Sequence, residues 1–405
     1  MDPAVSTFGL EPMSSTVSGP NVAVTLAQYV SPHGTRALII TDAGVNGAGI
    51  VKPITDALTT AGMKWQVFDQ VSPNPTDMNV VAGVAAINKF GLDGTVVVLI
   101  GGGSVMDCGK YIALAAPNGV DTLGLAFAPD LDANDRIDFS TLAPKASASK
   151  PGLPTIAIPT TSGTASETNG GGLVTDTQTN PANHRKLTFS NPSVRPRTIL
   201  LDPTLTVGMP SKGTAACGMD VLTHAIEAYT SLQSNPYADG LALHAIRLVA
   251  KYLPTAVTNG TDLEARAQMQ LASHLAGRAF SSGPLLGLVH ATGHPISGQL
   301  HQAHGQTLAT MLPHVMRFNR DAAGIAERYA NVGQALGSEL DPEAAIAAVE
   351  KLSKTVGTNR KLSELGATSD SIAALTQDAL RDLIILNTPR YPTRGEVHEL
   401  YAKAL

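Results

Sequence analysis

Short apolar runs alternate with segments of helical periodicity through the first half of the chain. Residues 50–62 and 78–91 carry apolar side chains at helical spacing, and each segment closes on a glycine. Between these segments lie compact apolar runs bounded by Gly, Pro or Asp, which are typical of buried strands. This alternation predicts a mostly parallel sheet covered by helices on both faces. The runs lie at 37–41, 65–68, 95–101, 155–159 and 198–202.

The strand pattern stops after about residue 205, and helical periodicity takes over. We therefore expect two domains, an α/β domain over 1–205 and an all-helical domain over 206–405. Residues 133–152 show no period and are expected to form an irregular surface connection. The clearest helical segments lie at 222–232, 240–253, 263–280, 342–357 and 371–386.

Composition excludes several classes of protein. In a chain of 405 residues, 43% are hydrophobic and 15% charged, which indicates a buried core rather than disorder. The net charge of -5 gives no basic footprint for nucleic acid. With only two cysteines, Cys108 and Cys217, we expect no disulfide framework. The N-terminus lacks a secretory pattern, and no apolar run is long enough to span a membrane, so we predict a cytoplasmic protein.

A glycine-rich turn follows the apolar run at 95–101. Because Gly101–Gly103 lack Cβ atoms, a pyrophosphate can approach their backbone N–H groups, and the next helix adds its positive end. We expect Ser104 to cap this helix and Asp107 to lie in its first turn. The turn is neither G-x-G-x-x-G nor a Walker A loop, which argues against kinases and ATPases. An ordinary glycine-rich turn is the plain alternative.

A second polar turn follows the apolar run at 155–159. Ligands of open α/β sheets bind at the carboxyl ends of strands, where hydroxyls and free backbone donors suit a ribose and phosphate. Two such turns in one predicted sheet favour a dinucleotide site. The hydroxyl-bearing residues of the second turn are Thr160, Thr161, Ser162 and Thr164.

Aspartate and histidine recur at helical spacing in the second half. Asp220 and His224 lie four residues apart, so a helix places both on one face, where they can hold one ion. One carboxylate with several imidazoles suits Fe²⁺ or Zn²⁺ better than Mg²⁺ or Ca²⁺. A surface or capping pair is the plain alternative, and spacing leaves open which other histidines are ligands. Four of the eleven histidines are close together: His290, His294, His301 and His304.

Several long motifs, in order, resemble those of the iron-containing (group III) alcohol dehydrogenases. The resemblance covers about residues 35–405. It implies a Rossmann-like α/β domain followed by an all-α domain, the dehydroquinate synthase-like fold of that family. The motifs are IGGGSVMDCGK, IPTTSGTASE, DPTLTVGMP, GMDVLTHAIEAY, GLVHATGHPISG, AHGQTLATMLPHVMRFN and the C-terminal NTPRYPTRGEVHELYAKA.

Position by position, the resemblance makes Asp220, His224, His290 and His304 the metal ligands. Fe²⁺ is the implied metal, with Zn²⁺ as the alternative. His294 becomes a catalytic residue near the nicotinamide that relays a proton.

The resemblance also implies an NAD site. Asp42 matches the family's acid that accepts a hydrogen bond from the adenosine ribose 2′-hydroxyl, which favours NAD over NADP. The other matching positions are Asn74, Gly102, Gly103, Ser104, Thr160, Thr161, Thr164, Lys186 and Leu205.

Three features depart from the family pattern. Gly171 aligns with a frequent asparagine, which affects the expected ribose or nicotinamide contacts. His301 is an unusual histidine, either a surface residue or part of the substrate entrance. Ile384–Leu386 precede an altered NTPR segment; if this segment borders the substrate, the pocket wall is apolar.

The reaction implied is the interconversion of a primary alcohol and its aldehyde with NAD(H), in a homo-oligomer without nucleic-acid or membrane partners. A divalent metal eases deprotonation of the alcohol, the nicotinamide takes the hydride, and His294 passes the proton toward solvent. The main alternative is a nicotinoprotein or transhydrogenase that retains NAD(H). A sugar-phosphate lyase on the related scaffold is disfavoured because few Lys and Arg flank the metal motifs, and a non-catalytic binding protein stays open.

Overall fold

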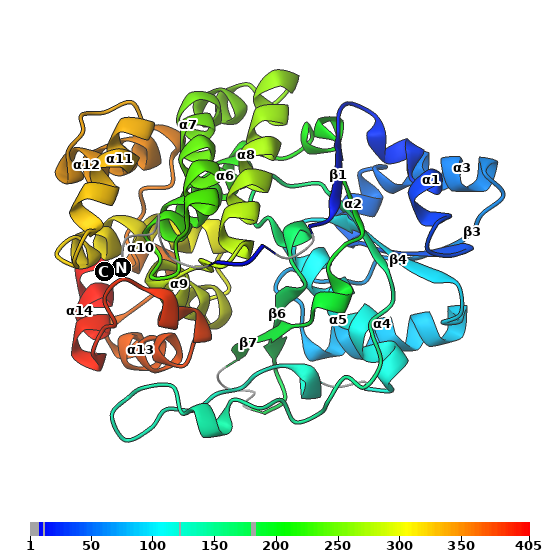
Figure 1. Ribbon diagram of the computed structural model, residues 1–405, viewed down its shortest axis with the longest axis horizontal. Helices are drawn as coiled ribbons and strands as arrows, with labels where there is room; N and C mark the ends of the chain where they lie inside the picture. The colour runs from blue at the N-terminus through cyan, green and yellow to red at the C-terminus, as the bar shows by residue number, and fades with distance from the viewer. Residues whose placement is uncertain (1–7, 11–12, 121–122, 180–183) are drawn as a thin grey trace.

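The computed structural model describes residues 8–10, 13–120, 123–179 and 184–405. A strand-containing half and a helical half lie side by side (Figure 1), and the predicted combination of an α/β and an all-α part is confirmed. In the described part of the chain, no helix is long and apolar enough to cross a membrane. Much of the N-terminus used to predict the lack of a secretory signal, 1–7 and 11–12, is outside the described residues.

The main sheet has six parallel strands in the order β1-β8-β5-β4-β2-β3. Five of them coincide with the predicted apolar runs. Four of these, β2, β4, β5 and β8, are buried along nearly all their length, whereas the edge strand β3 is only partly buried. Strand β1 was not predicted, because its residues, STVS, are mostly polar. The strands are β1 Ser15–Ser18, β2 Arg36–Ile40, β3 Lys64–Phe68, β4 Thr95–Gly101, β5 Thr155–Pro159 and β8 Thr198–Leu201.

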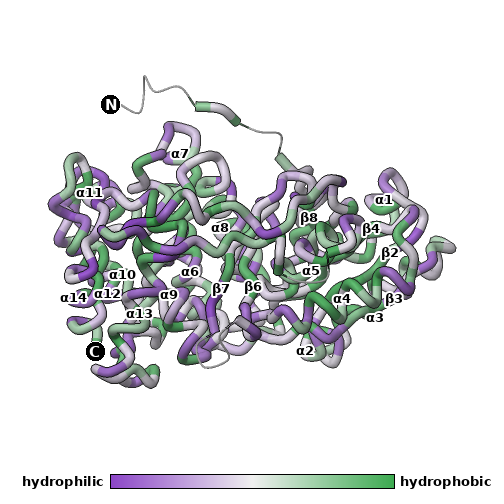
Figure 2. Tube along the Cα trace, turned by 90° about the horizontal axis from the view of Figure 1, so that it is seen from below, coloured by the Kyte–Doolittle hydropathy of each residue, from purple (hydrophilic) through white to green (hydrophobic). Residues whose placement is uncertain are grey.

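Side chains alternate across this sheet and build an apolar core on each face. Leu38 and Leu99 belong to one core, whereas Ile39 and Val98 belong to the other. Helices α4 and α5 cover the first face and are among the most hydrophobic stretches of the chain trace in Figure 2. The helices of this half are α1 Ala27–Val30, α2 Ala43–Gly47, α3 Val51–Thr60, α4 Asp77–Phe90 and α5 Gly103–Ala115.

An antiparallel hairpin of β6 (Gly171–Asp176) and β7 (Arg185–Ser190) lies between the two halves. Neither strand was predicted, because their mixed polar and apolar residues form no compact run. Lys186 on β7 reaches helix α9 of the helical half, where its Nζ donates to Ser297 Oγ over 3.2 Å. The hairpin is thus one of the links between the halves.

The helical half packs around α6, which is buried along most of its length. Beyond Leu201 the described residues form no strand, as the periodicity predicted. The segment predicted as one helix over 371–386 breaks after Leu380, because Asp382 accepts from Ile384 N and starts a 3₁₀ turn, η11, over Leu383–Asn387. The helices are α6 Ser211–Thr230, α7 Pro236–Thr258, α8 Leu263–Ser281, α9 Leu288–Gln299, α10 His304–Asn319, α11 Ile325–Ala335, α12 Pro342–Val356, α13 Ile372–Leu380 and α14 Arg394–Ala404.

Residues 123–152, which we call the strap, leave the α/β half and run beneath α13 and α14 (Figure 1). The strap is irregular, with only short 3₁₀ turns, as was predicted for its residues 133–152. Its tip docks on the helical half: Asp135 accepts two hydrogen bonds from Arg394, at 2.8 and 2.5 Å. The Arg136 guanidinium lies over the Tyr391 ring, 4.9 Å from its centroid.

We predict that Asp135→Asn loosens the strap while leaving its backbone undisturbed, because asparagine also tolerates the positive φ of 58° at this position. Limited trypsin digestion followed by mass spectrometry should show faster cleavage after Arg136. The control is Glu399→Gln, which removes an exposed pair with Lys403 on α14 but does not touch the strap. Equal cleavage rates in all three proteins would show that the Arg394 pair does not hold the strap.

Candidate active site

Helix α6 carries Asp220 and His224 one turn apart, and both side chains are buried. His224 Nε2 lies 3.3 Å from Asp220 Oδ1. The i, i+4 spacing therefore places them on one face, as the sequence predicted.

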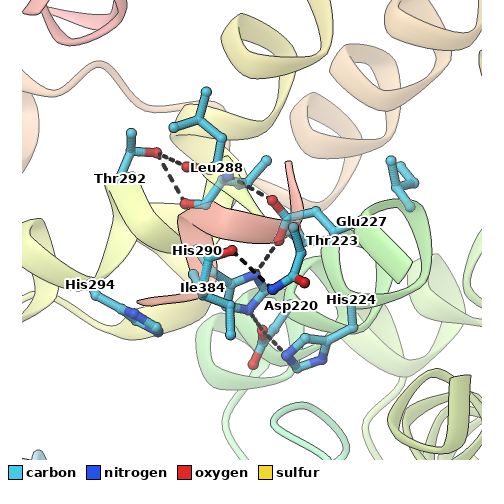
Figure 3. Close-up of polar contacts among 12 residues, drawn as sticks. Asp220, Thr223, His224, Glu227, Leu288, His290, Thr292, His294 and Ile384 are labelled. Atoms are coloured by element: carbon cyan, nitrogen blue, oxygen red, sulfur yellow. Dashed lines mark hydrogen bonds and ion pairs between the residues drawn. The ribbon is translucent and has the colours of Figure 1, made fainter. Parts of the chain in front are cut away.

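Two further histidines converge on the same carboxylate. His290 on α9 and His304 at the start of α10 each place Nε2 3.7 Å from Asp220 Oδ1. The close approach of α10 to α6 depends on Gly305, where a Cβ would lie 2.0 Å from the Ala216 carbonyl oxygen. Ligand atoms of Asp220, His290 and His304 lie within 4.8 Å of one another. Figure 3 shows Asp220, His224 and His290 turned toward one another.

The residues fit a metal ion. Asp220 Oδ1 and His290 Nε2 are buried and make no hydrogen bond to protein. Buried polar atoms without partners are rare in folded proteins, and an ion is one of the few reasons for them. A carboxylate oxygen with imidazole nitrogens is a donor set for Fe²⁺ or Zn²⁺.

Burial and neighbouring charges shift the pKa values of the Asp220 carboxylate and the three histidines in different directions. Burial would raise the pKa of Asp220, but His224 and His304 outweigh it and hold this pKa well below its ordinary value. Burial lowers the pKa of His224 to about 4 and that of His304 well below the usual range. Burial also acts to lower the pKa of His290, yet Glu227 and Asp220 raise it to about 9. His290 therefore keeps a proton at neutral pH in the metal-free protein.

Glu227 is a functional residue that the sequence reasoning missed. One of its carboxylate oxygens accepts from Val289 N over 2.6 Å, and the other lies 2.5 Å from His290 Nδ1. A carboxylate on Nδ1 fixes the ring so that Nε2 faces Asp220. The only signal was its position seven residues after Asp220, two helical turns along the same face.

His294 has a different partner from the other histidines. Its Nδ1 lies 2.5 Å from Asp382 Oδ2, just before η11, and Figure 3 shows its ring set apart from Asp220, His224 and His290. The ring stacks on His304, with centroids 5.2 Å apart. Burial would raise the pKa of Asp382, but His294 holds it below its ordinary value. Asp382 was not predicted, because 88 residues separate it from His294.

A small cavity of about 30 Å³ lies beside His294 and is open to solvent. It is bordered by β7, α9, the end of α13 and the root of the strap. None of Ile384–Leu386, the predicted apolar wall, is among its lining residues, although the preceding Leu383 is, and most of the lining is polar. The polar lining residues are His184, Arg185, Lys186, Thr188, His294, Asp378, Arg381 and Asp382.

The two predicted phosphate turns lie against each other at the carboxyl edge of the sheet. Thr160 N donates to Gly101 O over 3.0 Å. A Cβ on Gly103 would lie 2.5 Å from Thr164 Cγ2, and one on Gly102 would lie 3.0 Å from Thr161 Cγ2. The glycines thus allow the threonine turn to approach the first turn of α5.

Two local expectations for α5 were wrong. Gly102 is the N-cap, so Ser104 lies inside the first turn, where its Oγ accepts from Asn74 N over 3.3 Å. Asp107 lies beyond the first turn and accepts from Leu173 N over 2.9 Å and from Ser166 Oγ. These contacts join α5 to the second turn and to β6, partners that are distant in sequence.

The remaining predicted cofactor residues are more scattered. Asn74 has a positive φ of 52°, and its Oδ1 accepts from Ser297 Oγ over 3.4 Å. Lys186 contacts the same hydroxyl, and burial lowers its pKa to about 8. Asp42 follows β2, and Leu205 lies in a 3₁₀ turn after β8. Among the described residues, neither Asp42 nor Leu205 makes a hydrogen bond or ion pair with the others, although both follow strands of the same sheet.

Two of the residues that depart from the family pattern, Gly171 and His301, lie near the site. Gly171 begins β6, and its carbonyl accepts from the buried Lys110. His301 is exposed with φ 53°, and its ring centroid lies 6.1 Å from that of His184, which borders the cavity.

A parallel α/β half with phosphate-suited turns and a helical half with an Asp–His cluster are features of a two-domain, metal-dependent dehydrogenase. A sequence profile described as "Iron-containing alcohol dehydrogenase" matches residues 13–203. A second, "Fe-containing alcohol dehydrogenase family, C-terminal", matches residues 214–405. The chain belongs to the iron-containing alcohol dehydrogenase family, which confirms the resemblance.

Individual relatives span nearly the whole chain. It is 38% identical over 402 residues to "Probable alcohol dehydrogenase EutG" of Escherichia coli K12, which covers 99% of this chain and 95% of that protein. It is 34% identical over 378 residues to the "NAD-dependent methanol dehydrogenase" of Bacillus methanolicus, covering 91% and 92%. A crystal structure of 1,3-propanediol oxidoreductase superposes with a TM-score of 0.88 at 34% identity, covering 99% and 100%.

We predict that metal affinity of the metal-free protein rises between pH 7 and pH 9. The pKa of His290 is raised to about 9, so below that pH a proton competes with the metal for Nε2. Affinity should increase about tenfold per pH unit, with release of about one proton. Calorimetric titration in buffers of different ionisation enthalpy measures both quantities. Glu227→Gln, which removes one raising charge, should weaken this dependence, whereas pH-independent binding in the unmodified protein would contradict the prediction.

Proposed function

We propose that this protein is a divalent-metal-dependent, NAD-linked alcohol dehydrogenase that interconverts a primary alcohol and its aldehyde by hydride transfer. The observation that carries the proposal is the buried Asp220 carboxylate, whose free oxygen faces His290 and His304 from two other helices. The names of the relatives, an alcohol, a methanol and a propanediol enzyme, support the same reaction class.

The proposed metal ligands are Asp220, His224, His290 and His304. A bound divalent metal lowers the pKa of an alcohol oxygen and polarises an aldehyde carbonyl. Glu227 holds the His290 ring in place through Nδ1, so that a neutral imidazole presents Nε2 to the ion. We favour Fe²⁺ on the family assignment, with Zn²⁺ as the alternative that the same donors accept.

The proposed NAD site follows the carboxyl edge of the sheet. Bound NAD supplies the hydride acceptor. Backbone donors of the glycine turn and hydroxyls of the threonine turn suit the pyrophosphate and riboses, and Asp42 suits the adenosine ribose. Lys186 and Asn74 meet at Ser297, between the sheet edge and α9. The proposed residues are Asp42, Asn74, Gly102, Gly103, Ser104, Thr160, Thr161, Thr164, Lys186 and Leu205.

His294 is the proposed proton carrier. Asp382 accepts a hydrogen bond from Nδ1–H, so a neutral His294 has a free lone pair on Nε2 that can take the proton of the alcohol. The imidazolium that forms is stabilised by Asp382, and the open cavity beside both residues leads to solvent. In aldehyde reduction the proton moves in the opposite direction.

We also propose a cytoplasmic homo-oligomer. The two cysteines are free, which suits a reducing compartment. A nicotinoprotein that retains NAD(H) uses the same residues, and stoichiometric NAD(H) in extensively dialysed protein would select that alternative.

We predict that His290→Ala and His294→Ala fail in different ways. His290→Ala should lose both bound metal and activity, because the ion loses a ligand. His294→Ala should retain the metal while kcat falls by about 10²–10⁴, the usual contribution of a proton-transfer group. Metal content is measured by mass spectrometry and turnover by NADH absorbance at saturating alcohol. His301→Ala, an exposed histidine nearby, is the control, and a metal-free but fully active His290→Ala protein would refute the assignment.

A further inference from the structure

Two acidic residues follow neighbouring strands at the edge of the sheet that the proposed NAD site occupies. Strands β2 and β3 are parallel, with Ile40 opposite Phe68, so both end at this edge. Asp42 comes two residues after β2, and Asp69 directly follows β3. The pairing continues past the strands, since Asp42 forms an isolated antiparallel bridge with Gln70. The backbones of Asp42 and Asp69 are therefore held close together.

The two carboxylates are tied to the same short helix, α2. Asp42 Oδ1 accepts from Val45 N over 2.9 Å, and Asp69 Oδ2 accepts from Asn46 Nδ2 over 2.8 Å. Both acids are partly exposed, and neither makes an ion pair with a described Lys or Arg. This edge of the sheet thus carries two negative charges without a paired cation.

We propose that Asp69 is a second determinant of cofactor choice, which acts together with Asp42 to exclude the 2′-phosphate of NADP. The inference rests on the proposed function, because it takes Asp42 as the residue that meets the adenosine ribose. Sites that accept NADP commonly offer an arginine to the 2′-phosphate. Here a phosphate beside Asp42 would meet the charge of Asp69 as well.

The Asp69 carboxylate is close enough to the expected position of the 2′-phosphate to repel it. A residue next to a bridged pair lies within about 10 Å, the Debye length at 0.1 M salt, so screening between Asp69 and the phosphate is incomplete. Neutralising Asp42 alone therefore leaves part of the discrimination in place.

Asp69 could instead act only by holding α2 through Asn46, and the two roles are separable. Asn46→Ala removes the hydrogen bond to Asp69 but leaves both carboxylates charged. Asp69→Asn removes the charge and keeps an amide oxygen for Asn46. Only the second substitution should change the preference between the two cofactors.

The test is direct binding of NADH and NADPH to the full-length protein, followed by nicotinamide fluorescence at low and high ionic strength. Asp69→Asn should tighten NADPH roughly three- to tenfold and leave the Kd for NADH within about twofold, because only NADPH carries the extra phosphate charge. Adding Asp69→Asn to Asp42→Asn should give a further gain of similar size. High salt should reduce both gains.

The charge-matched control is Glu399→Gln on α14, in the other half of the molecule. The inference is overturned if Asp69→Asn changes the NADPH-to-NADH ratio no more than this control, or if Asn46→Ala reproduces the full change. Unmodified protein that binds neither cofactor would overturn the proposed function and this inference together. Binding of NADH with an unchanged ratio in Asp69→Asn would overturn the inference alone.

Discussion

Burial of one carboxylate, that of Asp220, is the constraint on which the helical half depends. The group is 2% exposed, and its Oδ1 has imidazoles from three helices around it. An ionised carboxylate in an apolar interior is costly unless positive charge compensates it. Helices α6, α9 and α10 therefore have to meet at this point, and a cation in the cluster would offset the negative charges of Asp220 and Glu227 together.

Buried or half-buried carboxylates also position the two histidines on α9. His290 is held from behind by Glu227, and His294, one turn further along α9, is held by Asp382. Near the end of α9, Lys186 from the β6–β7 hairpin donates to Ser297. His290, the proposed proton carrier His294, and Ser297, which contacts the hairpin, thus lie along a single helix.

Local patterns were enough to predict part of this structure. The buried strands are short apolar runs, and Asp220 and His224 need only helical spacing to share a face. The family resemblance supplied His290 and His304 as expected ligands. Features that depend on distant partners were not predictable. Strand β1 is polar and forms because it pairs with β8. The β6–β7 hairpin depends on its position between the two halves, and the position of the strap depends on its contact with Arg394. Glu227 and Asp382 have ordinary local sequences, and their roles exist only because a histidine from another segment meets each of them.

Anomalous diffraction from crystals grown with Fe²⁺ or Zn²⁺ and NAD would locate the metal site. We expect a single strong peak at the metal's absorption edge, at about 2.0–2.2 Å from the ligand oxygen and nitrogen atoms of Asp220, His224, His290 and His304. Crystals of active protein with a peak elsewhere, or with no metal between these four residues, would contradict this expectation.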